Sequence, residues 1–181
     1  MMKIKPNIIG YHVNSQKKCQ LFLENDKIII YEDVHWLGTG MYFWDNMANA
    51  NYWVRKKKEK GISDIWILQV VISLEDYLDL SDEELLDQFN QLWVAFLKKK
   101  NYYHKGKYVK LDSPLGVKLD LLFDFYNDLN ENFKVIKAVG MYEYRSEKDF
   151  LNGSRVTNKI KILYCARDKS VILDKEKLKV V

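Results

Sequence analysis

The chain has 181 residues, the length of one globular domain, and we expect a single domain over residues 1–181. Its 48% hydrophobic and 30% charged residues are typical of a globular protein, and a net charge of +4 is too small to indicate nucleic-acid binding by itself. No apolar run approaches the ~18 residues of a membrane span, and the N-terminus lacks a signal-peptide pattern. We therefore expect a cytoplasmic protein in which Cys19 and Cys165 are free thiols.

The first half of the chain is predicted to alternate strands, which are β-branched, aromatic or continuously apolar, with amphipathic helices. Asp45 or Asn46 can cap the second helix, and Gly61 can end it. The predicted elements are a strand over Asn7–Val13, a helix over Ser15–Asn25, a strand or extended segment over Lys27–Tyr31, a glycine-rich turn over Leu37–Gly40, a strand over Met41–Trp44, a helix over Asp45–Lys60 and a central strand over Asp64–Ile72.

The second half opens with a capping box at Ser81–Glu84. It precedes a helix with an apolar stripe (Leu85, Phe89, Leu92, Phe96), which we interpret as core. The remaining predicted elements are a loop over Tyr102–Leu111, a helix from Pro114 to Leu129, strands over Phe133–Tyr144 and Asn158–Cys165 with an irregular segment over Arg145–Thr157 between them, and a short strand with a frayed tail over Lys169–Val181. No βαβ repeat is evident, which favours an α+β fold.

The most informative stretch is LGTGMYFWDNMANANYWV, residues 37–54. A glycine turn leads into a Gly-Met-Tyr-Phe strand (Gly40–Phe43) and then a helix with Ala50-Asn51-Tyr52; about thirty residues upstream of Tyr42 stands Gly10-Tyr11-His12. This order resembles the NAD signature of poly-ADP-ribose polymerases and small bacterial ADP-ribosyltransferases. The resemblance implies an ADP-ribosyltransferase-like α+β fold with two packed, mostly antiparallel β-sheets, flanking helices and an NAD cleft.

The resemblance also implies roles for these residues. Nicotinamide is a flat ring that stacks well on tyrosine, so Tyr42 and Tyr52 are expected to enclose it. The strand edge at Gly10 and Tyr11 would bind its carboxamide, and His12 would bind a ribose hydroxyl. The expected NAD-binding set is Gly10, Tyr11, Gly38, Gly40, Phe43, Asn49 and Tyr52, where Asn49 stands in place of a serine of the polymerases.

Cleavage of the nicotinamide–ribose bond passes through an oxocarbenium-like transition state, which a carboxylate stabilises. The family places a glutamate on a later strand, and Glu143 is our candidate, with Glu147 as the competitor. The catalytic set is then His12, Tyr42 and Glu143, with no metal expected.

The sequence therefore predicts a mono-ADP-ribosyltransferase that moves ADP-ribose from NAD to a protein or nucleic-acid acceptor. One alternative is a module of the same fold that binds NAD or ADP-ribose without turnover. Another is a small basic RNase-like toxin that uses His12 or His104. Taken singly, His12 and the GTGMYFW run are equally compatible with ordinary core packing, and a toxin or defence role is an analogy from fold.

Overall fold

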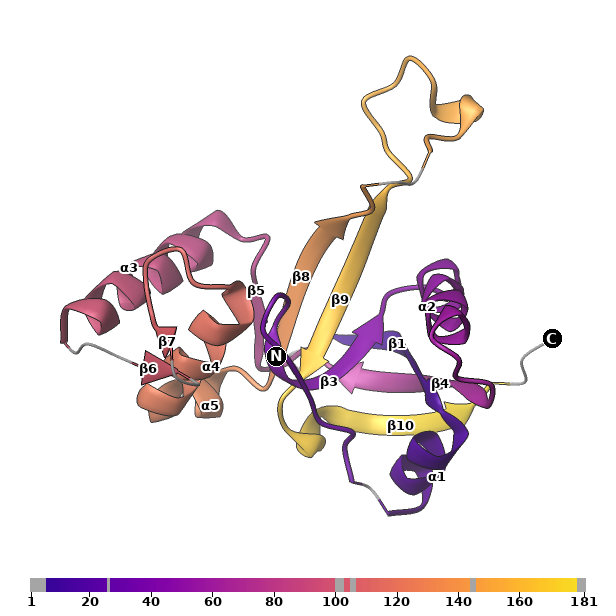
Figure 1. The fold of residues 1–181 in the computed structure, drawn as a ribbon, viewed down its shortest axis with the longest axis horizontal. Helices are drawn as coiled ribbons and strands as arrows, with labels where there is room; N and C mark the ends of the chain where they lie inside the picture. Colours follow the sequence, from indigo (N-terminus) through magenta and orange to yellow (C-terminus); the bar gives the residue numbers. More distant parts are fainter. Residues whose placement is uncertain (1–5, 26, 100–102, 105–106, 144–145, 179–181) are drawn as a thin grey trace, which may run out of the picture.

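A computed structural model describes residues 6–25, 27–99, 103–104, 107–143 and 146–178, and it has the α+β architecture that the sequence predicts (Figure 1). The strands are β1 (Asn7–Ser15), β2 (Tyr31–Asp33), β3 (Gly38–Trp44), β4 (Ile65–Ser73), β5 (Tyr77–Asp79), β6 (Tyr103–His104), β7 (Lys107–Tyr108), β8 (Val135–Met141), β9 (Ile160–Ala166) and β10 (Ile172–Lys177). The helices are α1 (Gln16–Asn25), α2 (Met47–Glu59), α3 (Glu83–Lys99), α4 (Leu115–Phe125) and α5 (Asn127–Asn132), with single 3-10 turns η1 (Asp149–Leu151) and η2 (Lys169–Val171).

The sheet is one continuous path of strands rather than the two separate packed sheets that we expected. Its order is β10-β4-β1-β3-β9-β8-β5, with β2 also paired to β3, and β6 and β7 form a small hairpin of their own. All pairs are antiparallel except β5 with β8, so the sheet is mixed. A single pair, Tyr11 with Trp44, joins β1 to β3, and β8 and β9 run steeply across the direction of β4 and β10 (Figure 1). The two halves of the sheet are thus joined at a narrow point.

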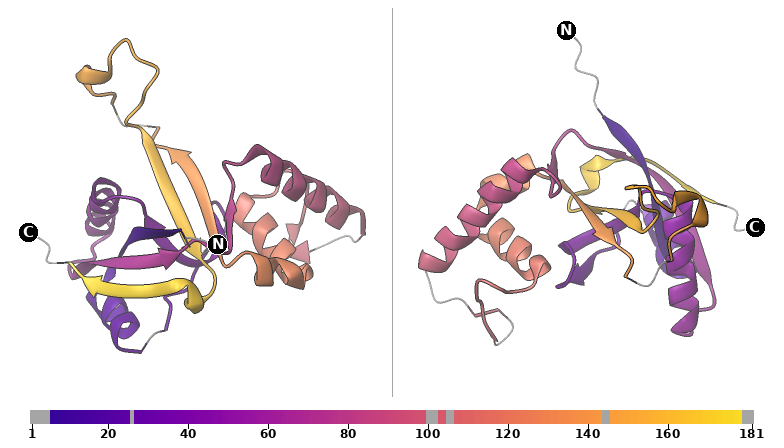
Figure 2. Two further views of the ribbon diagram at one scale, coloured as in Figure 1. Left: turned by 180° about the vertical axis from the view of Figure 1, so that it is seen from behind. Right: turned by 90° about the horizontal axis from the view of Figure 1, so that it is seen from above.

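The two faces of the sheet bury separate cores. Along β3, Met41 and Phe43 belong to the cluster that includes residues of α1, whereas Trp44 belongs to the cluster that includes residues of α2, α3 and α4. Leu163 and Tyr164 of β9 divide in the same way. This alternation follows from the two-residue period of a strand, and it places Tyr42 and Trp44 on one face. Helices α3, α4 and α5 gather at one side of the sheet (Figure 2).

Most predicted elements of the first half are confirmed within a few residues. The side chain of Asn46 caps α2 by accepting from the Asn49 amide, and Gly61, at φ 81°, follows the helix. Of the strand or extended segment expected over Lys27–Tyr31, only Tyr31 lies in a strand, which continues to Asp33. One prediction is wrong: the turn expected at Leu37–Gly40 lies over residues 34–37, because Gly38 already pairs with β2.

In the second half, α3 is capped by Asp82, whose side chain accepts from the Leu85 amide, and not by Ser81. The Ser81 hydroxyl instead donates to Asp79 at 2.5 Å. The apolar stripe of α3 is buried or partly buried core, as expected. The helix predicted from Pro114 to Leu129 is broken at Tyr126 into α4 and α5, and β8 ends at Met141. Parts of the predicted 102–111 loop, and residues 144–145 and 179–181, lie outside the described residues.

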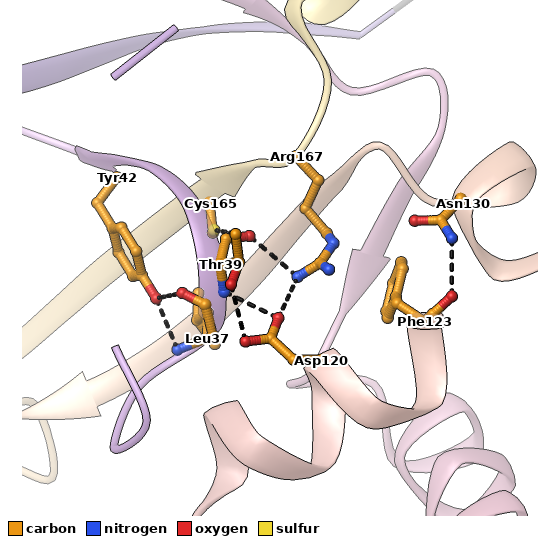
Figure 3. A network of polar contacts seen from close by, with 9 residues as sticks. Leu37, Thr39, Tyr42, Asp120, Phe123, Asn130, Cys165 and Arg167 are labelled. Carbon is orange, nitrogen blue, oxygen red and sulfur yellow. Dashed lines mark hydrogen bonds and ion pairs between the residues drawn. The ribbon is translucent and has the colours of Figure 1, made fainter. Parts of the chain in front are cut away.

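A buried polar network attaches α4 to the centre of the sheet (Figure 3). The Asp120 carboxylate accepts from the Thr39 amide and hydroxyl, both at 2.9 Å, and pairs with Arg167 at 3.0 Å. Arg167 also donates to the Thr39 carbonyl and lies over the ring of Phe123. Gly38 has a φ of 74°, and a Cβ there would clash with the Asp120 carboxylate. The network therefore fixes the start of β3 and needs glycine at position 38.

Candidate functional site

A pocket of about 280 Å³, which we name the central pocket, lies beside the narrow join between β1 and β3. Beyond the Tyr11–Trp44 pair, β1 keeps its full ladder with β4 but makes no further paired register with β3 among the described residues. The pocket is lined by His12 and Val13 of β1, Tyr31, Glu32 and Asp33 of β2, Tyr42 and Trp44 of β3, Trp53 and Lys57 of α2, and by Trp36, Lys60 and Leu163.

His12 bridges the two strands where their backbones no longer pair. Its Nδ1 lies 2.7 Å from the Tyr42 carbonyl oxygen, and the amide nitrogen of Asn14 lies 3.1 Å from its Nε2. A carbonyl can only accept, so Nδ1 is protonated, and Nε2 is left to accept from the Asn14 amide. The side chain is only 2% exposed, and burial lowers the pKa of His12 to about 4. The imidazole is therefore neutral at physiological pH, with both nitrogens engaged.

Asn14 and Tyr31 extend this network, and the sequence analysis missed both. The Asn14 amide lies 2.7 Å from the Tyr31 hydroxyl, which in turn lies 2.9 Å from the Asn14 side-chain oxygen. Lys18 donates to the same hydroxyl at 3.3 Å. Asn14 stands two residues after His12 on β1, so their side chains share one face of the strand. That spacing was the available signal for Asn14.

Tyr42 lines the central pocket, and its hydroxyl is engaged by the backbone before β3. Its hydroxyl donates to the Gly38 carbonyl at 2.6 Å and accepts from the Leu37 amide at 3.1 Å (Figure 3). Burial also raises the pKa of this phenol, so it stays protonated. The Tyr42 hydroxyl is thus not available as an acid or base.

The pocket walls are aromatic and the rim carries charges of both signs. Trp44 and Trp53 stack with ring centroids 5.1 Å apart and planes inclined by 16°. Lys57 and Lys60, at the end of α2, supply cations, and Glu32 supplies a carboxylate. An aromatic interior with cations at its edge suits a flat ring joined to phosphate groups.

The structure does not bring Tyr52 and Glu143 to the same pocket as His12 and Tyr42. Both line a separate basic pocket of about 490 Å³, formed by Tyr52, Arg55, Lys56, Met141, Tyr142, Glu143 and Lys161. Tyr52 contacts Tyr142 there, at a centroid distance of 4.6 Å. Glu143 is exposed in the turn after β8. The expected Tyr42–Tyr52 sandwich is therefore not formed, and Trp53 rather than Tyr52 lines the central pocket together with Tyr42.

The expected glycines serve close packing. A Cβ at Gly10 would come within 2.9 Å of Ile72 and Phe43, and one at Gly40 would meet Cys165 and the Ala166 carbonyl. Each glycine therefore lets two elements approach closely.

Four further candidates also have structural partners. Phe43 is fully buried in the core on the opposite face of β3, and Tyr11 is partly buried against the other core cluster. Asn49 is 1% exposed, and its side chain donates to Asp45 at 2.7 Å. Glu147 lies in the segment between β8 and β9, where it accepts from the Thr157 hydroxyl at 2.5 Å; this bond lowers the pKa of Glu147. None of the four lines the central pocket as described.

Three other features of the described part of the chain concern metal binding, thiol chemistry and membrane spanning. No group of three or more His, Cys, Asp or Glu there is placed to hold a metal ion. Cys19 and Cys165 are free and buried, and burial raises their pKa values to about 11 and about 12, so both stay protonated. Of the helices that the structure describes, none is long and apolar enough to cross a membrane.

No protein-family model, curated protein or solved structure matches this chain. The resemblance to ADP-ribosyltransferases therefore rests on the sequence motifs alone.

Proposed function

We propose that the chain binds NAD in the central pocket and acts as a mono-ADP-ribosyltransferase. The observation that supports this most is that His12 and Tyr42, thirty residues apart in sequence, contact each other and line one aromatic pocket. These two residues are the ones that the resemblance assigns to NAD. Their convergence supports the proposal because packing alone does not require a pocket at this point of the sheet.

The pocket offers a partner for each part of NAD. The nicotinamide ring would lie against Tyr42 and Trp53. Lys57 and Lys60 would neutralise the pyrophosphate. A ribose hydroxyl would reach the His12 Nε2 only by replacing the Asn14 amide there, since that nitrogen already accepts from Asn14.

The transfer itself breaks the bond between ribose C1 and the nicotinamide nitrogen. The electron pair of that bond neutralises the pyridinium ring, and C1 is left with oxocarbenium character. An oxygen or nitrogen of the acceptor then bonds to C1 and releases its proton to solvent. A carboxylate near C1 would stabilise the cationic stage.

We assign that carboxylate to Glu32 in preference to Glu143. Glu32 and Asp33 are the carboxylates lining the central pocket as described, whereas Glu143 lines the basic pocket. One oxygen of Asp33 already accepts from the backbone amides of His35 and Trp36. These bonds give Asp33 a role in the turn before β3, and we therefore propose Glu32 as the carboxylate at the ribose.

A binding module without turnover is the second candidate, and Lys161 favours it. Leu163 of β9 lines the central pocket, and Lys161 lies two residues earlier on the same strand, so both point to one face. The Lys161 amine lies 4.4 Å from the ring centroid of Trp36, another wall of the pocket. A cation so close would raise the energy of a cationic transition state. For an RNase-like enzyme, by contrast, a neutral His12 with both nitrogens engaged is a poor acid or base.

Incubation with NAD and measurement of free nicotinamide distinguish the two candidates. The transferase predicts nicotinamide release by the parent protein, and loss of release on the order of 10²-fold or more in Glu32→Gln, with NAD binding kept. Glu143→Gln is the matched control and should release nicotinamide like the parent. Loss in Glu143→Gln with a normal Glu32→Gln would return the role to Glu143. NAD binding by an inactive parent would establish the binding module.

A further inference from the structure

Beside the central pocket, another face of α2 borders two neighbouring pockets. One is the basic pocket, and the other, which we name the outer pocket, has a volume of about 600 Å³. The outer pocket is lined by Ala48, Asn51, Arg55, Ser146, Lys148 and Asn158. Arg55 lines both, so the two pockets adjoin at this residue, and we name them together the track. The segment between β8 and β9 projects from the rest of the molecule (Figures 1 and 2), and its Ser146, Lys148 and Asn158 line the outer pocket.

Cations dominate the track. Four cationic side chains line it as described, Arg55, Lys56, Lys148 and Lys161, against a single carboxylate, that of Glu143. Arg55 is exposed, and Lys56 is engaged by Glu59 in a surface ion pair that a stronger anion can replace. The track therefore suits a ligand with several negative charges, such as a chain of phosphates.

Aromatic rings lie among these cations. The Arg55 guanidinium and the Lys56 amine are each 5.8 Å from the ring centroid of Tyr52. The Lys161 amine lies 4.6 Å from the ring centroid of Tyr142. Cations that follow a phosphate backbone, together with aromatic rings on which bases stack, are the two elements of single-strand recognition. An acidic peptide would use the cations but would have no need of the rings.

The track also lies next to the central pocket. Tyr52 lines the track and Trp53, the next residue of α2, lines the central pocket, with their rings edge to face at 5.9 Å. Lys161 and Leu163 make the same connection on β9. Two residues along a strand span about 7 Å. A ligand in the track would thus lie within reach of the ribose of NAD bound in the central pocket.

We propose that the track binds single-stranded nucleic acid, with phosphates on Arg55 and its neighbouring lysines and a base on Tyr52. Resting on the proposed function, this makes a nucleic acid the acceptor of ADP-ribose. A nitrogen or oxygen of the acceptor bonds to ribose C1 and loses a proton, and nicotinamide leaves with the electron pair of the broken bond. Duplexes fit the track less well, because their bases are already stacked on one another.

Fluorescence anisotropy of a labelled single-stranded RNA of about 12 nucleotides tests the proposal in the absence of NAD. The variant is Arg55→Ala, and the control is Lys58→Ala, which removes the same charge from an exposed position of α2 that lines none of the three pockets. We expect binding by the parent and a loss of about fivefold or more in Arg55→Ala, with the slope of log affinity against log salt reduced by about one. Lys58→Ala should bind within about twofold of the parent.

Three results overturn the proposal: no RNA binding by the parent, equal losses in Arg55→Ala and Lys58→Ala, or tighter binding of poly-glutamate than of the RNA. The last would indicate an acidic protein partner. The rise in melting temperature with NAD, measured separately, tests the proposed function alone. Arg55→Ala should keep that rise, so failure of either proposal is recognised independently.

Discussion

Acidification should destabilise the protein through His12. The buried ring has a pKa of about 4, against 6.5 for an unperturbed histidine, and burial is the largest cause. His12 therefore becomes protonated below about pH 6.5 in the unfolded chain but only near pH 4 in the folded chain. The contribution of neutral His12 to the free energy of unfolding is fully present above the pKa of the unfolded state, and it is lost as the pH falls toward the pKa of the folded state. A shift of about 2.5 pKa units corresponds to roughly 3 kcal/mol.

Urea unfolding between about pH 7 and pH 4 measures this loss. His12→Asn places an amide donor near the position of Nδ1 but cannot titrate, so its free energy of unfolding should fall much less over the same window. His35→Gln, which changes an exposed histidine, should retain the slope of the parent. A flat parent profile, or an unchanged slope in His12→Asn, would show that His12 is not buried as a neutral ring.

Three substitutions test the supports of the central pocket, each by urea unfolding. Tyr42→Phe loses the hydroxyl that bonds to Gly38 and should cost about 1–2 kcal/mol, yet it should still bind NAD because the ring remains. Asp120→Asn leaves Arg167 without its buried partner charge and should cost about 3–5 kcal/mol. Gly116→Ala forces a methyl group against the backbone of the turn before β3 and should cost about 1–3 kcal/mol.

Asp124→Asn, an exposed change on the same helix, is the control for Asp120→Asn and should be nearly silent. A small cost for Asp120→Asn would mean that the network in Figure 3 does not hold α4 to the sheet. Parent-like stability of Gly116→Ala would mean that α4 does not press against the turn.

The sequence predicted those elements that are determined by residues adjacent in the chain. The apolar run of β4 and the Asn46 cap of α2 are set by adjacent residues, and both were confirmed. The start of β2 at Tyr31 is set by pairing with β3, and the parallel pairing of β5 with β8 joins segments more than fifty residues apart. Neither leaves a periodic signal. The cap of α3 lies at Asp82 and not at Ser81 because the Ser81 hydroxyl donates to Asp79, two residues earlier in the chain.

The sequence predicted which strand residues meet at the candidate site, but it did not predict which side of α2 faces that site. His12 and Tyr42 converge as expected, since alternation on neighbouring strands fixes which side chains can face one another. Adjacent helix residues differ by about 100° in direction, and sequence does not fix how α2 turns about its axis. Trp53 therefore lines the central pocket where Tyr52 was expected. Glu143 fell outside it because β8 ends two residues earlier.

The most direct test of the central claim is a calorimetric titration of NAD into the parent protein and into Tyr42→Ala, with Lys58→Ala as the control. The account predicts one NAD bound per chain, affinity lower by roughly 1–3 kcal/mol in Tyr42→Ala, where the stacking ring is lost, and parent-like affinity in Lys58→Ala. Melting curves without ligand establish that each variant is folded. No heat of binding in the parent, or equal affinity in a folded Tyr42→Ala, would contradict NAD binding in the central pocket.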